Sequence, residues 1–189
     1  MPLPIWLYIA GWGVFLYLFI QIFNFSASPD NSNHLFTMGM YFLNLGVHEA
    51  AHFATFFLPQ IVISSAGSIA EIIFALLLLI AAIKGKSYFA AVFTGLWVMF
   101  SFISAGIYMS DARAQAIPLI GPGENLSHDW YYVFSQLGWL DADTLIGGGM
   151  RVAGITIGVA SLAFGLYVIA LKILRWKSTR GTKAKEFAR

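Results

Sequence analysis

The amino-acid sequence predicts an all-α, polytopic membrane protein with about five transmembrane helices. Hydrophobic residues make up 59% of the 189 residues and charged residues only 11%, less than half of the roughly 25% that is usual in soluble domains. The mean hydropathy is +0.75, and the apolar residues extend along the whole chain, so a core of this size could not bury them. The composition therefore excludes a soluble enzyme and a disordered chain.

Five stretches reach or approach the roughly twenty apolar residues that are needed to cross a bilayer. They are Pro4–Phe23, Leu35–Leu58, Ile61–Ile83, Tyr88–Met109 and Val152–Leu174. The first stretch has no basic segment before it and is too long for a secretory signal, so we expect a retained helix. Residues 1–174 are thus predicted to form a single transmembrane domain, and residues 175–189 a basic cytoplasmic tail.

The connections between these stretches carry polar residues and helix breakers. Residues 24–34 form a polar loop, and Lys84-Gly85-Lys86 closes a short turn between the third and fourth stretches. The fourth connection, residues 110–151, contains the sequence Ser127-His128-Asp129-Trp130-Tyr131-Tyr132. This pattern is typical of a capped, aromatic helix, and we expect it to lie at the membrane interface.

The basic residues predict the orientation of the chain. Seven of the eleven Lys and Arg residues lie between Lys172 and Arg189, and the Lys84–Lys86 turn is two predicted spans away. Because short loops rich in Lys and Arg stay in the cytoplasm, we expect a cytoplasmic C-terminus and, with five spans, an external N-terminus. A polybasic segment directly after an apolar one favours contact with anionic lipid, so no nucleic-acid partner is expected.

A His-Glu-x-x-His motif lies within the second apolar stretch, at His48-Glu49-Ala50-Ala51-His52. Residues four apart on an α-helix are rotated by only about 40° and displaced by about 6 Å, so both imidazoles can reach one metal ion. Glu49 lies on a neighbouring part of the surface, where it can act as a general base on a metal-bound water. Ionisable groups within a membrane span are functional candidates because they are costly to insert.

The remaining ligands of such a site must be His, Asp or Glu, because the chain contains no cysteine and only four histidines. That number of histidines is too small for a membrane di-iron hydroxylase. A catalytic zinc site needs a third protein ligand and one open position, and we consider Asp111 and His128 as candidates. One further ligand with a water favours hydrolysis, whereas binding by both residues would close the site and favour a structural role.

Glu71 is the other ionisable residue placed within a predicted span. Three alternatives are open for its side chain. It can hydrogen-bond a metal-ligating histidine, bind the backbone of a peptide in the site, or make an interhelical hydrogen bond as a protonated carboxyl. The small residues near it, including Gly67, would allow helices to approach closely in each case.

These motifs resemble the site-2 protease family of intramembrane zinc metalloproteases, in particular its small and poorly characterised bacterial members. The motif at residues 48–52 matches the family's His-Glu-x-x-His sequence. Residues 66–71, Ala-Gly-Ser-Ile-Ala-Glu, have the spacing of the family's Ala-Gly-Pro-x-Ala-Asn motif, with Ser68 and Glu71 as departures. Asp111 looks like the counterpart of the family's Leu-Asp-Gly aspartate, although its neighbours here are Ser110 and Ala112.

The resemblance implies that His48, His52 and Asp111 bind zinc and that Glu49 activates water for attack on a peptide bond. The expected function is therefore that of a metalloprotease-like hydrolase in the bacterial inner membrane, with membrane lipid and a transmembrane peptide substrate as its partners. The alternative is a non-catalytic membrane protein that binds metal or serves as an accessory subunit of a membrane complex. The coordination sphere of the metal would distinguish the two.

Overall fold

The structure is a computed structural model that describes residues 4–27, 35–119 and 127–187, with side chains described as far as residue 178. The described residues form helices and connecting turns, with no strand among them. The helices are α1 (Ile5–Ala27), α2 (Leu35–Thr55), α3 (Gln60–Lys84), α4 (Tyr88–Ser110), α5 (Asp129–Leu137), the short 3₁₀ helix η2 (Leu140–Ala142) and α6 (Asp143–Phe187). The predicted all-α fold class is confirmed for this part of the chain.

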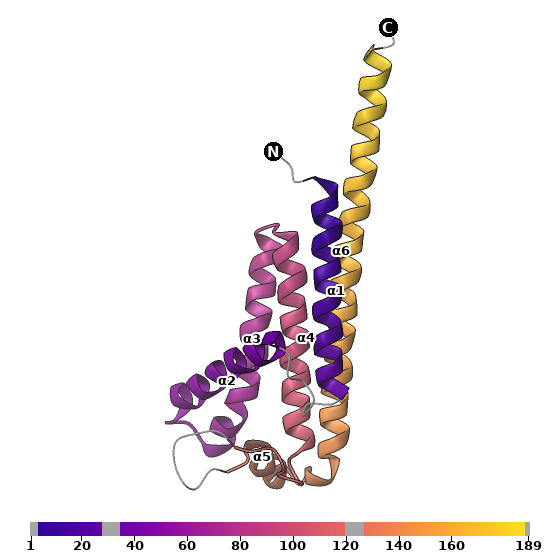
Figure 1. Ribbon diagram of the computed structural model, residues 1–189. Helices are drawn as coiled ribbons and strands as arrows, with labels where there is room; N and C mark the ends of the chain where they lie inside the picture. The colour runs from indigo at the N-terminus through magenta and orange to yellow at the C-terminus, as the bar shows by residue number, and fades with distance from the viewer. Residues whose placement is uncertain (1–3, 28–34, 120–126, 188–189) are drawn as a thin grey trace.

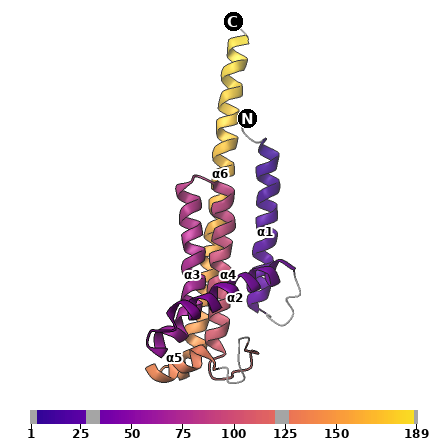
Figure 2. The same cartoon turned by 90° about the vertical axis from the view of Figure 1, so that its left-hand side faces the viewer.

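Four helices are long and apolar enough to cross a membrane, as expected of a membrane-embedded protein: α1, α3, α4 and the segment Leu140–Ser178, most of which is α6. The expected number of five is not confirmed. The helix that does not qualify is α2, because Asn44, His48, Glu49 and His52 lower its hydropathy. It also crosses the bundle obliquely instead of running beside the other long helices (Figures 1 and 2).

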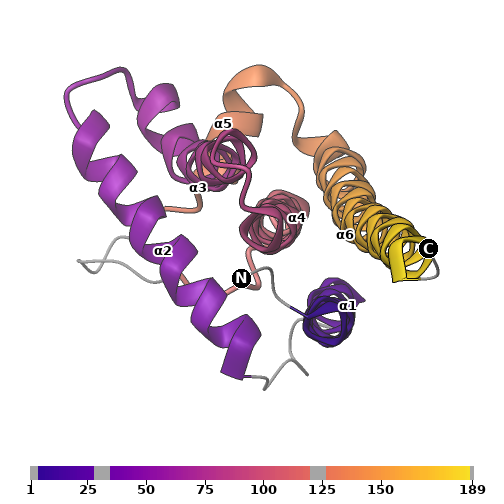
Figure 3. The same ribbon diagram turned by 90° about the horizontal axis from the view of Figure 1, so that it is seen from above.

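Helix α4 lies at the centre of the bundle. Two-thirds of its apolar window is buried (67%), whereas the corresponding windows of α1, α3 and α6 are between 11% and 22% buried. Viewed along the bundle, α1, α2, α3 and α6 surround α4 (Figure 3). The outer helices therefore keep most of their apolar surface for lipid, and α4 supplies much of the core.

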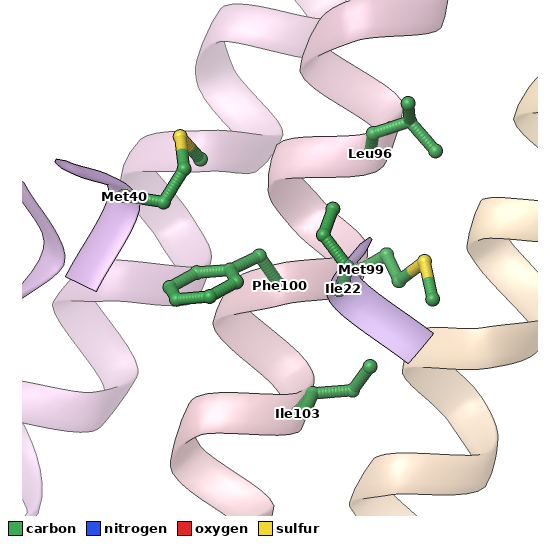
Figure 4. Packing of buried hydrophobic residues seen from close by; sticks show 6 residues of the cluster. All are labelled: Ile22, Met40, Leu96, Met99, Phe100 and Ile103. Atoms are coloured by element: carbon green, nitrogen blue, oxygen red, sulfur yellow. The ribbon is translucent and has the colours of Figure 1, made fainter. Parts of the chain in front are cut away.

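The largest apolar cluster joins α4 to the ends of α1 and α2. Its buried members come from these three helices and are shown in Figure 4: Ile22, Met40, Leu96, Met99, Phe100 and Ile103. Because Met40 belongs to this cluster, the first half of α2 is fixed against α4. The second half of α2, which carries both histidines, then extends over α3.

Small residues bring α4 and α6 into close contact. A Cβ atom added to Gly154 would lie 2.8 Å from the carbonyl oxygen of Met99, and one added to Gly106 would lie 2.6 Å from the carbonyl oxygen of Gly147. Glycines at such positions allow backbones to approach and pack within a membrane, where burial of apolar surface gives little preference for one arrangement. The α4–α6 pair therefore forms the rigid frame on which the other helices pack.

The helix directions differ from the expected topology at the start of the chain. The first turn of α1, the turn between α3 and α4, and the far end of α6 lie toward the same end of the bundle (Figures 1 and 2). The expected placement of the two termini on opposite sides depended on a crossing by α2. Helix α6 also continues without a break past residue 174, so the predicted tail begins as an extension of the last helix.

The surface of α2 has its polar side chains inside and its apolar side chains outside. Asn44 and His48 are buried, whereas Met38, Phe42 and Phe53 are exposed. This is the reverse of a helix on a water-soluble protein. The polar face of α2 therefore meets the bundle, and this arrangement positions the two histidines next to α3.

Candidate metal centre

Three side chains from two helices converge at the end of the bundle that carries α5. His48 and His52 project from α2, and Asp129 is the first residue of α5. The Nε2 atoms of His48 and His52 lie 3.3 Å and 3.2 Å from Oδ2 of Asp129. One donor atom from each residue lies within 4.8 Å of the other two. The predicted pairing of His48 with His52 thus acquires a third potential ligand, and that ligand is neither of the two residues expected.

Both imidazoles are oriented through Nδ1, the ring nitrogen that does not face Asp129. Nδ1 of His48 lies 2.7 Å from Oε1 of Glu71, and Nδ1 of His52 lies 2.9 Å from the carbonyl oxygen of Ile63. A carbonyl oxygen accepts only, and so does an ionised carboxylate, so each Nδ1 carries the proton and donates it. When the imidazoles are neutral, their Nε2 atoms direct lone pairs toward Asp129, and when they are protonated, the same atoms donate to its carboxylate.

When both imidazoles are neutral, three acceptor atoms face one another in this group. Two neutral imidazoles and a carboxylate repel unless a proton or a metal ion binds the lone pairs. Ligands held about 2.0–2.1 Å from a tetrahedral zinc ion are about 3.3 Å apart. The observed separations of 3.3 Å and 3.2 Å between Nε2 and Oδ2 agree with that geometry. The donor set therefore fits zinc.

Asp129 is held in place by the start of α5 and by α4. The side chain of His128 caps α5 by accepting a hydrogen bond from the backbone N–H of Tyr131 at 3.2 Å. The hydroxyl of Tyr108 accepts from the backbone N–H of Asp129 at 3.2 Å and lies 3.4 Å from Oδ2. Because the cap side chain turns back onto its own helix, the next residue is the one that faces α2.

Helix α5 is attached to α3 by a buried tryptophan. The indole Nε1 of Trp130 donates to the hydroxyl of Ser68 at 3.0 Å, and both residues are buried. Around them lies a second apolar cluster that includes Met109, Val133 and Phe134. This contact keeps the first turn of α5 beside the histidines, and it gives Ser68 a structural role.

The ring of His48 has room because residue 67 is a glycine. A Cβ atom at Gly67 would lie 2.4 Å from Nε2 of His48 and equally close to the neighbouring ring carbons. Any larger residue would displace the imidazole. Gly67 is therefore part of the site, as a position where α3 approaches the ring.

Burial and charge act in opposite directions on Asp129. Burial raises the pKa of its carboxyl group, but hydrogen bonds with His48 and His52, and the positive charge of those rings when protonated, lower it further than burial raises it. The pKa of Asp129 is thus below its usual value. An ionised carboxylate beside two imidazoles is the form that binds a divalent cation.

Glu49 lies on the edge of the site and is half-buried. Its negative charge acts on the hydroxyl of Tyr108, which also contacts Asp129. The carboxylate is not part of the three-residue group. The expected role of Glu49 as a general base stays a prediction.

The structure places Asp111 and His128 together but outside the three-residue group. Oδ2 of Asp111 lies 3.4 Å from Nε2 of His128, and the two carboxylate oxygens of Asp111 accept from the backbone N–H groups of Ala116 and Ile117. Burial lowers the pKa of His128 in spite of the nearby Asp111 charge. In this arrangement Asp111 stabilises the turn after α4, and His128 stabilises the start of α5.

Asp129 was the residue that sequence reasoning missed. It lies next to His128 at the start of the predicted helix, but only Asp111 and His128 were considered as candidates for the third ligand. The available signal was the capping position. A side chain that caps its own helix is engaged with the backbone, so the acidic residue in the first turn is the better candidate for a ligand.

Comparisons of the chain with protein-family models, with curated proteins and with solved structures give no match. The functional argument therefore depends on the geometry of the site.

Proposed function

We propose that this protein is a zinc-dependent hydrolase of the membrane that cleaves a peptide bond, with zinc held by His48, His52 and Asp129. The observation that carries the proposal is the convergence of two Nε2 atoms on one carboxylate oxygen at separations of 3.3 Å and 3.2 Å. Both Nδ1 atoms are engaged by acceptors, which leaves the Nε2 lone pairs for a metal ion.

The number of protein ligands favours catalysis over a structural role. Asp111 accepts from backbone N–H groups and His128 caps α5, so three protein ligands would remain for a zinc ion, with one position open. About 22% of the His52 side chain is exposed, so the three-residue group is not sealed inside the protein and a substrate can approach it. Zinc at such a site lowers the pKa of a bound water and polarises a carbonyl group.

Glu49 is the proposed general base. It lies one position after His48 on the same helix and is half-buried beside Tyr108. From this place it can accept a proton from water and pass it to the leaving amine. The Tyr108 hydroxyl holds Asp129 through its backbone N–H and keeps the third ligand in position.

The proposed location is a bacterial inner membrane crossed by α1, α3, α4 and α6. The turn between α3 and α4, which carries Lys84 and Lys86, lies at the same end as the basic stretch of α6 (Figure 1), and this end is assigned to the cytoplasm. The first turn of α1 then lies on the cytoplasmic side as well. Helix α5 lies at the opposite, outer interface, and α2 is immersed in the outer leaflet with its exposed apolar side chains toward lipid.

The proposed substrate is a peptide segment that reaches the site from the membrane. Gly67, which contacts His48, lies about 10 Å along α3 from its first residue at 1.5 Å per residue. The metal site would therefore be close to the outer interface but below it. The competing function is that of a non-catalytic subunit that binds the metal. Hydrolysis requires Glu49 as a base, whereas the competing function does not.

The test combines metal analysis with mapping of peptide ends. Purified protein should contain about one equivalent of zinc, and a His48→Ala/His52→Ala variant should contain none. Bacterial membranes that contain the wild-type protein should yield new peptide ends that are absent with Glu49→Gln. If wild-type protein from zinc-replete cells contains no metal, the proposed zinc site is wrong. If zinc is bound but the peptide ends are identical in both samples, the proposed hydrolysis is wrong and the zinc site is not affected.

A further inference from the structure

A chain of hydrogen bonds runs from the centre of the bundle to His48. The indole Nε1 of Trp97 donates to Oδ1 of Asn44 at 2.9 Å. Nδ2 of Asn44 donates to Oε2 of Glu71 and to the hydroxyl of Ser101, both at 3.0 Å. The other carboxylate oxygen of Glu71 lies 2.7 Å from Nδ1 of His48. We call Trp97, Asn44 and Glu71 the polar relay.

The first member of the relay fixes the direction of the hydrogen bonds as far as Glu71, and the ionised form of Glu71 would fix the last one, to His48. An indole N–H can only donate, so the atom of Asn44 that faces Trp97 must be the carbonyl oxygen. The amide NH₂ of Asn44 is then directed at Glu71, whose carboxylate accepts with one oxygen and has the other free to accept from His48. With Glu71 ionised, the proton of a neutral His48 must therefore be on Nδ1.

Water has little access to the relay. Asn44 is 2% exposed and Glu71 is 6% exposed, Trp97 is partly buried, and Ser101, which accepts from Asn44, is fully buried. A buried polar group that loses its partner costs about 1–3 kcal/mol. The directions of the hydrogen bonds are thus enforced by the lack of alternative partners, and His48 cannot change its tautomer without breaking one of them.

We propose that Asn44 and Glu71, oriented by Trp97, are positioning residues that hold the proton of His48 on Nδ1 and present its Nε2 lone pair to the metal. This inference rests on the metal site of the proposed function and adds the residues that set its ligand tautomer. Nδ1 of His52 obtains the same orientation from a backbone group, the carbonyl oxygen of Ile63. The relay thus serves only the ligand that is more deeply buried.

The relay predicts that Glu71→Gln is harmful for a specific reason. The new amide must offer its oxygen to the NH₂ of Asn44, because the opposite orientation would bring two NH₂ groups together. Its own NH₂ then faces Nδ1 of His48 and requires an acceptor there. The proton of His48 moves to Nε2 and blocks the ligand atom, so zinc affinity should fall about 10–100-fold.

A second substitution should reverse this effect. In the Asn44→Asp/Glu71→Gln double variant, the new carboxylate accepts from Trp97 and from the NH₂ of the new glutamine. The glutamine oxygen is then free to accept from Nδ1 of His48, which restores the original tautomer. Zinc affinity should return to within a few-fold of the wild-type value. If these residues had a purely structural role, there would be no reason for the double variant to recover the zinc affinity that Glu71→Gln loses.

The experiment uses the full chain in detergent micelles and two measurements. ¹⁵N-histidine NMR of metal-free protein, recorded at a pH at which His48 is neutral, reports which nitrogen of His48 carries the proton, with the signals of His48 identified by comparison with a His48→Ala sample. Competition with a chromophoric chelator gives zinc affinity. Thr94→Val is the matched control, since Thr94 is a buried polar residue of α4 whose hydroxyl bonds its own helix at Ala90.

The outcomes separate the relay from the metal site. The expected result is an Nδ1–H tautomer in the wild type and in Thr94→Val, an Nε2–H tautomer with weaker zinc binding in Glu71→Gln, and recovery of both in the double variant. An unchanged tautomer and affinity in Glu71→Gln overturns the relay and leaves the zinc site standing. Loss without recovery in a folded double variant also overturns it. Wild-type protein that binds no zinc overturns the proposed function, while the NMR result still decides the tautomer.

Discussion

Nε2 of His48 lies 3.3 Å from Oδ2 of Asp129, a residue 81 positions later in the chain. Neither atom can donate a proton to the other when both groups are in their metal-binding forms, so in those forms the contact is favourable only with a cation between them. Helix α5 carries Asp129 to this position, and α3 orients the imidazole from its other side. The site therefore depends on three helices.

The ligand role of Asp129 is tested against that of Asp111. Asp129→Asn removes the charged ligand and should lower zinc affinity at least about 10-fold, whereas Asp111→Asn should leave one zinc per chain. Chelator competition and elemental analysis of both purified variants make the measurement. Normal zinc content in Asp129→Asn together with loss in Asp111→Asn would restore the ligand set expected from the sequence.

The contact of Gly67 with His48 predicts a steric effect on the metal. Gly67→Ala places a methyl group 2.4 Å from Nε2 of His48 and must displace the ring, so bound zinc should be largely lost. Gly46→Ala is the matched control, because a Cβ atom there meets no atom within 4 Å. Equal zinc content in the two variants would contradict the close contact between residue 67 and the His48 ring.

Glu49→Gln separates chemistry from binding. The substitution keeps the size of the side chain but removes the base, so cleavage should fall about 10²–10⁴-fold while the zinc content stays the same. Rates measured with a cleaved membrane substrate, once the mapping of peptide ends identifies one, provide the comparison. Cleavage at the wild-type rate would assign the base to another residue.

Docking of α5 through Trp130 predicts a change in stability. Ser68→Ala leaves the buried indole N–H without its acceptor and should destabilise the protein by about 1–3 kcal/mol. Ser65→Ala is the control, since the Ser65 hydroxyl accepts no bond from α5 and donates to carbonyl oxygens of its own helix. Thermal unfolding in detergent should show a lower midpoint for Ser68→Ala only, and matching midpoints would argue against the docking contact.

The topology can be tested by cysteine labelling, because the chain has no cysteine of its own. Trp6→Cys and Lys86→Cys should react with a membrane-impermeant reagent from one side of the membrane and Trp139→Cys from the other. The exposed Trp6 lies in the first turn of α1 and the exposed Trp139 lies between α5 and η2, and the first turn of α1 and α5 lie at opposite ends of the bundle (Figure 1). Labelling of Trp6→Cys and Lys86→Cys from opposite sides would mean that α2 crosses the membrane.

Much of the fold follows from composition and periodicity. Apolar stretches of about twenty residues have few alternatives to a helix in lipid, where backbone groups must be satisfied within the segment. The same reasoning predicted that α2 also crosses the membrane, because a count of apolar residues ignores where they lie around the helix. Its polar residues face α3 and α4 and its apolar residues face outward, and only the packing shows that this helix runs obliquely.

The sequence by itself determined the local part of the site. His48 and His52 share a face because four residues make about one helical turn, and Glu49 follows directly. The tertiary structure decided what depends on distant segments: the third potential ligand is Asp129, Glu71 bonds His48, and Asp111 pairs with His128. Helix spacing fixes which residues of one helix lie together, but the packing of α5 against α3 and α4 selects among carboxylates that the sequence leaves equivalent.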